Sequence, residues 1–188
     1  QRHQRFGNEP SAIGAEMPKQ SHKMKDISGK EVTIKDAVKG NGVLVLFSCN
    51  TCPYVVKNET RILAICEFAQ KLNIGVIVIN SNEAYRGGED SYDAMKEYAA
   101  EKKYNWFYTV DTNSEVADAF GANRTPETFL FSKDLKLTYH GAIDDNAGDE
   151  TAVKRQHLRE AMTEMAAGKD VSVKESRSVG CTIKRKKA

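Results

Sequence analysis

Two runs of apolar residues have the pattern of strands buried on both faces. Residues 42–47 read Gly-Val-Leu-Val-Leu-Phe, and Ile74–Ile79 forms the second run. Between them, from Pro53 to Asn73, apolar residues recur at helical spacing. Strand, helix and strand in this order predict a right-handed βαβ unit.

The alternation of strands and helices continues on both sides of this unit. The patterns predict a hairpin of Lys23–Asp26 and Glu31–Ile34, a helix at Ser91–Lys103, a strand at Trp106–Val110, a helix at Glu115–Phe120, a hairpin of Phe129–Phe131 and Lys136–His140, and a last helix at Thr151–Ala167. We therefore predict an α/β fold with a mixed central sheet and helices on both faces.

Length and charge divide the chain into three parts. At 188 residues it suits one domain, which we place at residues 13–176, after a flexible N-terminal arm of residues 1–12. Residues 177–188 form a basic tail, which carries Cys181 and holds five Lys or Arg and no acidic residue; 23 basic and 26 acidic residues remain before it. Because this body is mildly acidic, we expect no nucleic-acid partner. No apolar run approaches the roughly 18 residues that span a bilayer, so we expect no transmembrane segment.

The candidate chemistry lies in the sequence Cys49-Asn-Thr-Cys52-Pro53, where a buried strand ends and a helix begins. The first amides of a helix lack internal partners and the helix dipole is positive there, so the position lowers the pKa of a thiol. We expect Cys49 to be the more exposed thiol and the nucleophile. Cys52, one turn into the helix, is then placed to attack the mixed disulfide and release the product.

Thr125-Pro126 comes just before the predicted strand Phe129–Phe131. Proline is excluded from central strands, so this position suggests either a cis peptide bond or an ordinary trans turn. A cis bond exposes the backbone of Thr125, which can then pair with an extended peptide.

Together these residues resemble the thioredoxin-like superfamily, in particular the redoxin branch that includes bacterial alkyl hydroperoxide reductase and thiol-specific antioxidant proteins. The resemblance covers about residues 12–183 and is carried by residues 13–18, 45–54, 79–82, 121–131, 140–146 and 180–184. It implies a thioredoxin-like fold with a cis Pro126 beside the dithiol. It also implies a redoxin-type insertion, which is the helix and strand of Ser91–Val110.

The resemblance implies a thiol–disulfide oxidoreductase in which Cys49 and Cys52 are catalytic. Thr125 and Pro126 border the substrate groove, and Tyr54 forms an apolar wall. One alternative is a peroxiredoxin-like thiol peroxidase, although those enzymes place Thr or Ser where this chain has Cys49, three residues before Cys52. The other is a non-catalytic binding module whose Cys49–Cys52 pair is a structural disulfide.

The two remaining cysteines have separate interpretations. Cys66 follows Cys52 by about 20 Å along the same predicted helix, too far for a disulfide, and is expected to be a small core residue. Cys181 is either an accessory redox thiol that resolves the oxidised C-x-x-C or a free thiol of the tail. The histidines are scattered, so we expect no metal site.

We expect no cofactor. The expected partners are a protein or small-molecule thiol or disulfide substrate and an electron donor or acceptor. The chain begins at Gln1 with an irregular arm, which suits a processed protein of the bacterial cell envelope; the cytoplasm is the alternative.

Overall fold

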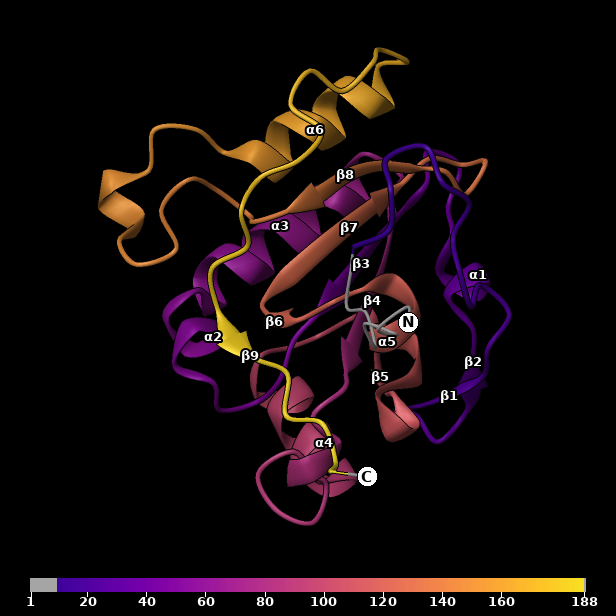
Figure 1. Ribbon diagram of the computed structural model, residues 1–188, viewed down its shortest axis with the longest axis vertical. Coiled ribbons are helices and arrows are strands. Elements are labelled where there is room, and N and C mark those ends of the chain that lie inside the picture. The colour runs from indigo at the N-terminus through magenta and orange to yellow at the C-terminus, as the bar shows by residue number, and fades with distance from the viewer. Residues whose placement is uncertain (1–9, 188) are drawn as a thin grey trace, which may run out of the picture.

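A computed structural model describes residues 10–187 of the chain (Figure 1). Most of the expected arm, residues 1–12, therefore lies outside the described residues. The strands are β1 Met24–Asp26, β2 Glu31–Val32, β3 Val43–Phe47, β4 Gly75–Asn80, β5 Phe107–Val110, β6 Arg124–Thr125, β7 Glu127–Phe131, β8 Leu137–Gly141 and β9 Cys181–Thr182. The helices are α1 Ile34–Ala37, α2 Pro53–Lys57, α3 Glu59–Lys71, α4 Tyr92–Glu101, α5 Glu115–Phe120 and α6 His157–Ala166, with short 3₁₀ turns at η1 Glu83–Tyr85, η2 Thr112–Ser114 and η3 Glu150–Ala152.

Seven strands form one mixed sheet in the order β2-β1-β5-β4-β3-β7-β8. The two predicted apolar runs are its parallel centre, with Val43 opposite Gly75 and Phe47 opposite Ile79. The hairpin β7–β8 joins antiparallel beside β3. The predicted insertion supplies α4 and β5, which extends the sheet on the other side of β4. This is a thioredoxin-like fold, as predicted.

Helices cover both faces of the sheet. Leu44 and Leu46 of β3 pack on one face, in a core shared with α3, α4 and α6. Val43, Val45 and Phe47 point to the other face, toward α1 and α5. All five residues of β3 are buried, which explains why its sequence is apolar without alternation.

Two predicted helices have different bounds in the structure. The helix expected from Pro53 to Asn73 is divided at Asn58, whose side-chain amide donates to the carbonyl oxygen of Tyr54 at 2.7 Å. Such local bonding competes with helical geometry. The helix expected from Thr151 begins only at His157, because Lys154 and Arg155 pair with Asp145 instead.

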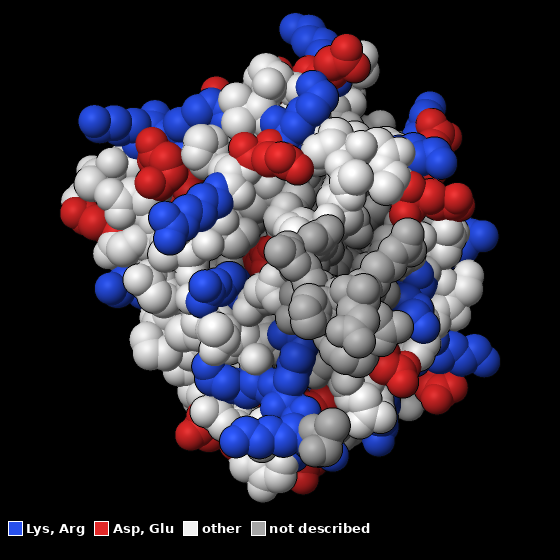
Figure 2. Space-filling model, in the orientation of Figure 1, with Lys and Arg blue, Asp and Glu red and all other residues white. Residues whose placement is uncertain are grey.

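The C-terminal tail folds against the domain. Strand β9 pairs with β6 in a separate two-stranded sheet, and the chain then runs on toward η1 (Figure 1). Figure 2 shows Lys and Arg side chains gathered where this segment, which contains the run Lys184–Lys187, crosses the surface. Among residues 10–187 no helix is both long and apolar enough to span a membrane.

Candidate functional site

The C-x-x-C segment lies where the sequence places it, between the end of β3 and the start of α2. Cys52 is the N-cap residue of α2, and Pro53 occupies the first helical turn. Proline fits there because its missing N–H would have no helical partner. The buried strand and the helix therefore fix the backbone on both sides of the two cysteines.

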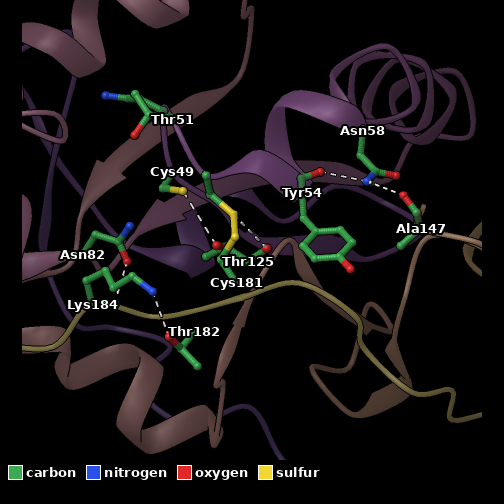
Figure 3. The surroundings of a disulfide bond; sticks show 12 residues. Cys49, Thr51, Tyr54, Asn58, Asn82, Thr125, Ala147, Cys181, Thr182 and Lys184 are labelled. Atoms are coloured by element: carbon green, nitrogen blue, oxygen red, sulfur yellow. Dashed lines mark hydrogen bonds between the residues drawn. A yellow bond between two sulfur atoms is a disulfide. The ribbon is translucent and has the colours of Figure 1, made fainter. Parts of the chain in front are cut away.

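A disulfide joins Cys52 to Cys181 of β9, with 6.3 Å between their Cα atoms (Figure 3). Cys49 is a free thiol, so the alternative of a structural Cys49–Cys52 disulfide does not match the observed pairing. Cys66 is free and fully buried in the core, as predicted, and burial raises its pKa. The tail cysteine is thus part of the site.

The exposure of the two C-x-x-C thiols is the reverse of the expectation. Cys49 is 1% exposed and Cys52 is 8% exposed. Burial raises the pKa of Cys49, and the negative charge of Asp90 raises it further. Hydrogen bonds from Thr125 and from the amides of Cys52 and Thr51 lower it, but by less. The helix start does favour a thiolate, and the loss of solvation outweighs it.

The raised pKa of Cys49 predicts how its reactivity depends on pH. With Cys52 and Cys181 joined, the slow modification by iodoacetamide that is lost in Cys49→Ser reports on Cys49, and its rate should still be rising above pH 9.0, because the thiolate is the reacting form. Asp90→Asn removes a nearby negative charge and should shift the midpoint to lower pH. Cys49→Ser provides the background rate. A wild-type midpoint below pH 9.0 would contradict this account of the thiol.

The Thr125–Pro126 peptide bond is cis, which resolves the alternative left open by the sequence. Thr125 is buried and contacts both cysteines of the C-x-x-C (Figure 3). Its Oγ1 lies 3.6 Å from Sγ of Cys49, and its carbonyl oxygen lies 3.5 Å from Sγ of Cys52. In the register of β6 and β9, Thr125 is also opposite Cys181. Thr125 therefore lies at the meeting point of three cysteines.

Tyr54 is half-buried in α2 and packs against the core cluster that includes both cysteines of the C-x-x-C. Its carbonyl oxygen accepts the side-chain amide of Asn58, which also donates to Ala147. The side chain therefore extends from a short helix whose end is tied to a distant loop (Figure 3).

A buried polar network holds the C-x-x-C loop. The carboxylate of Asp90 accepts from the backbone amide of Asn50 at 2.9 Å and from the side chains of Asn80 and Asn82. The hydroxyl of Tyr108 donates to Asn50 at 2.6 Å. From the sequence, Asp90 is only a helix start signal; its contact with a loop 40 residues earlier depends on how β4 and α4 pack.

A second buried pair holds the backbone next to the cis bond. Glu127 accepts from the amides of Asn123 and Arg124, and its other oxygen lies 2.5 Å from Nε2 of His140. His140 in turn stacks on Phe129. The sequence contains no sign that Glu127 and His140 pair, and the interpretation of His140 as a solvent-capping histidine at a strand end is wrong, because its side chain is buried against Glu127.

The disulfide borders a cavity of about 190 Å³ whose lining includes Cys52, Cys181, Tyr85 and Lys184. Cys52 is therefore a lining residue of a surface cavity. Cys49, on the inner side, does not line it. Among residues 10–187 there is no group of three or more acidic, His or Cys side chains arranged to hold a metal ion.

Comparison with known proteins gives one family and several structural relatives. Residues 12–156 match the family described as Redoxin. An uncharacterized conserved protein from Geobacillus kaustophilus is 30% identical, with 94% of each chain covered and a TM-score of 0.87. A hypothetical protein from Sinorhizobium meliloti is 28% identical over 96% of this chain and 98% of its own, with a TM-score of 0.86.

More distant structures share the fold. A mutant of PrxQ from Xylella fastidiosa is 13% identical, with a TM-score of 0.62 over 85% of this chain and 98% of its own. No curated protein matches the sequence.

Proposed function

Because the chain belongs to the Redoxin family and is a thiol-based redox protein, we propose that it is a thiol–disulfide oxidoreductase whose exchange centre is Cys52. Cys49 and Cys181 serve as two alternative resolving thiols. The observation that carries the proposal is the arrangement of three cysteines around Thr125. Cys52 and Cys181 form a disulfide, Cys49 is a free thiol, and Sγ of Cys52 and Sγ of Cys49 both contact Thr125.

The geometry favours Cys52 over Cys49 as the first thiol to react with substrate. Cys52 borders the cavity that opens on the disulfide, whereas Cys49 is nearly inaccessible and has a raised pKa. A thiol that reacts with an external substrate needs access as well as thiolate character. The proposal therefore reverses the order expected from the sequence, while keeping both cysteines in the reaction.

The proposed reaction transfers two electrons from the protein to a substrate disulfide. The thiolate of Cys52 attacks one substrate sulfur; the substrate S–S bond breaks, and the first substrate thiolate leaves and takes up a proton. The thiolate of Cys181 or Cys49 then attacks Sγ of Cys52 and releases the second substrate thiol. A donor dithiol reverses these steps and restores the reduced protein.

Thr125, Pro126 and Tyr54 are proposed to border the substrate. The cis bond leaves the backbone of Thr125 on the same side as Sγ of Cys52, 3.5 Å from its carbonyl oxygen. Backbone pairing beside the reacting sulfur would orient an extended substrate without requiring a particular sequence.

The experiment that tests the proposal is a redox titration of the Cys52–Cys181 pair in dithiothreitol and glutathione buffers, with alkylation and intact mass as the readout. If the pair takes part in exchange, its reduction potential is expected to lie between about −120 and −270 mV. A potential well below about −300 mV would mean a structural disulfide, and the proposed exchange would be wrong.

The rate at which the reduced protein consumes peroxide distinguishes a thiol–disulfide oxidoreductase from the alternative, a thiol peroxidase. Cys49 occupies the position where peroxiredoxins carry Thr or Ser, so we expect hydrogen peroxide to oxidise Cys52 no faster than a free thiol at the same pH. Rapid consumption of peroxide would favour the peroxidase instead.

A further inference from the structure

The tail pairs with β6 beside the cis bond as an extended strand, at the place where the proposed substrate groove would lie. Thr182 pairs with Arg124 and Cys181 with Thr125. The amide of Ile183 then donates to Asn123 at 3.0 Å. These are backbone contacts of the kind that hold an added strand, and they depend little on side-chain identity.

The contacts continue past the strand. The amide of Lys184 donates to the side chain of Asn82 at 2.9 Å, and its carbonyl oxygen accepts from Ala84 at 2.9 Å (Figure 3). Asn82 is itself held by Asp90, the residue that also holds the C-x-x-C loop. The groove and the reacting loop therefore share one buried support.

Two positions of the tail do depend on the side chain. A Cβ on Gly180 would lie 2.3 Å from the carbonyl oxygen of Thr125, so the groove has no room for a side chain there. Ile183 is 6% exposed and belongs to the apolar core under α5. By contrast, Thr182 is exposed and Val179 is 39% exposed.

We infer that the tail is a built-in competitor for the substrate and that its sequence reports what the groove accepts. The inferred substrate class is an extended protein segment with a reactive cysteine, a glycine directly before it and an aliphatic residue two positions after it. This inference rests on the proposed exchange at Cys52. A small thiol would use neither the backbone pairing nor the apolar position of Ile183.

The competition needs no reagent beyond the thiol of the incoming segment and the Cys52–Cys181 disulfide, and it runs in the reverse direction of the proposed exchange, because here a thiol reduces the oxidised protein. The thiolate of an incoming segment attacks Sγ of Cys52, and the Cys52–Cys181 bond breaks. The electron pair stays on the sulfur of Cys181, which takes up a proton from solvent. The incoming strand then takes the place of β9, while the attached tail remains close enough to return.

The test uses the full chain carrying Cys49→Ser and Cys181→Ser, so that Cys52 reacts and nothing resolves it. The probe is a peptide with the sequence of residues 178–184, activated as a mixed disulfide with thionitrobenzoate. Attack by Cys52 forms the peptide–protein disulfide and releases the coloured thionitrobenzoate, which gives the rate.

Peptides with single changes supply the matched comparison. Gly180→Val and Ile183→Ser in the peptide should each slow the reaction by about tenfold or more, because one creates a clash and the other loses apolar burial. Val179→Ser, at an exposed position, should leave the rate within about twofold. Equal rates for all four peptides would overturn the inferred selectivity.

A small disulfide distinguishes this failure from failure of the proposed function. Dithiobis(nitrobenzoic acid) reports whether Cys52 exchanges at all. If it reacts and the peptides show no selectivity, the exchange stands and the inference is wrong. If Cys52 reacts with neither reagent, both are wrong.

A change in the protein tests the competitor role separately. Gly180→Ala in the otherwise native chain should shift the Cys52–Cys181 pair toward the dithiol in a glutathione buffer and should speed reaction with the peptide. Gly87→Ala is the matched control, because a Cβ there meets nothing within 4 Å. Wild-type behaviour of Gly180→Ala in both assays would contradict the competitor role of the tail.

Discussion

Cys52→Ser is expected to reduce the rate of disulfide exchange to the uncatalysed rate. Cys49→Ser and Cys181→Ser are each expected to lower this rate by less than about tenfold. Cys52 is the partner of Cys181 in the disulfide and the C-x-x-C thiol that borders the external cavity. Either remaining cysteine can resolve a mixed disulfide on Cys52, so loss of one resolving thiol leaves a route. The measurement is the rate of reduction of a small disulfide with dithiothreitol as donor.

Cys66→Ala provides the matched control for removing a cysteine. Cys66 is fully buried in the same core and takes no part in the disulfide, so its replacement should leave the exchange rate unchanged. Full activity of Cys52→Ser, or complete loss in Cys49→Ser alone, would contradict Cys52 as the exchange centre. The double variant Cys49→Ser/Cys181→Ser should complete the first half of the reaction and stop.

The largest effect on stability is expected from Arg61→Met. The guanidinium of Arg61 lies 2.9 Å from a carboxylate oxygen of Asp144 and also donates to the carbonyl oxygens of Asn146 and Ala147. Both charged side chains are buried. Removing one leaves the other charge buried without its partner, which typically costs about 3–5 kcal/mol. Urea unfolding of wild type and variant measures the difference.

Arg155→Met is the control for this loss, because it breaks a half-exposed pair. Arg155 lies 3.1 Å from Glu160, and these side chains are 28% and 51% exposed. Exposed pairs contribute about 0–1 kcal/mol, so this variant should remain close to the wild type. Similar stability losses in the two variants would show that burial of the Arg61 pair does not determine the effect.

The central sheet could be predicted because its strands are buried on both faces. An apolar run such as Val43–Phe47 is typical of a strand buried on both faces in an α/β chain, and the helical spacing after Pro53 predicted the single helix that the structure divides into α2 and α3. The position of the C-x-x-C segment, between this strand and this helix, could be predicted for the same reason. The helix bounds near Asn58 and Asp145 differ from the predicted ones because these side chains form hydrogen bonds with the backbone, which the spacing of apolar residues cannot predict.

The site was harder to predict because its parts are distant in the sequence. The disulfide spans 129 positions, and β9 is two residues long, too short to show any alternation. Cysteine spacing does not tell which pair forms. The thiol state of Cys49 depends on opposing effects of backbone amides and burial, and only the packing around it decides their balance.

The most direct test of the central claim is to identify the cysteine that a substrate captures first. The reduced chain carrying Cys181→Ser is mixed for short times with a substoichiometric amount of the activated peptide of residues 178–184. The cysteine that carries the peptide is then located by proteolysis and mass spectrometry. We predict that the peptide is attached to Cys52 and is then released as a Cys49–Cys52 disulfide forms. A first adduct on Cys49 would contradict the account.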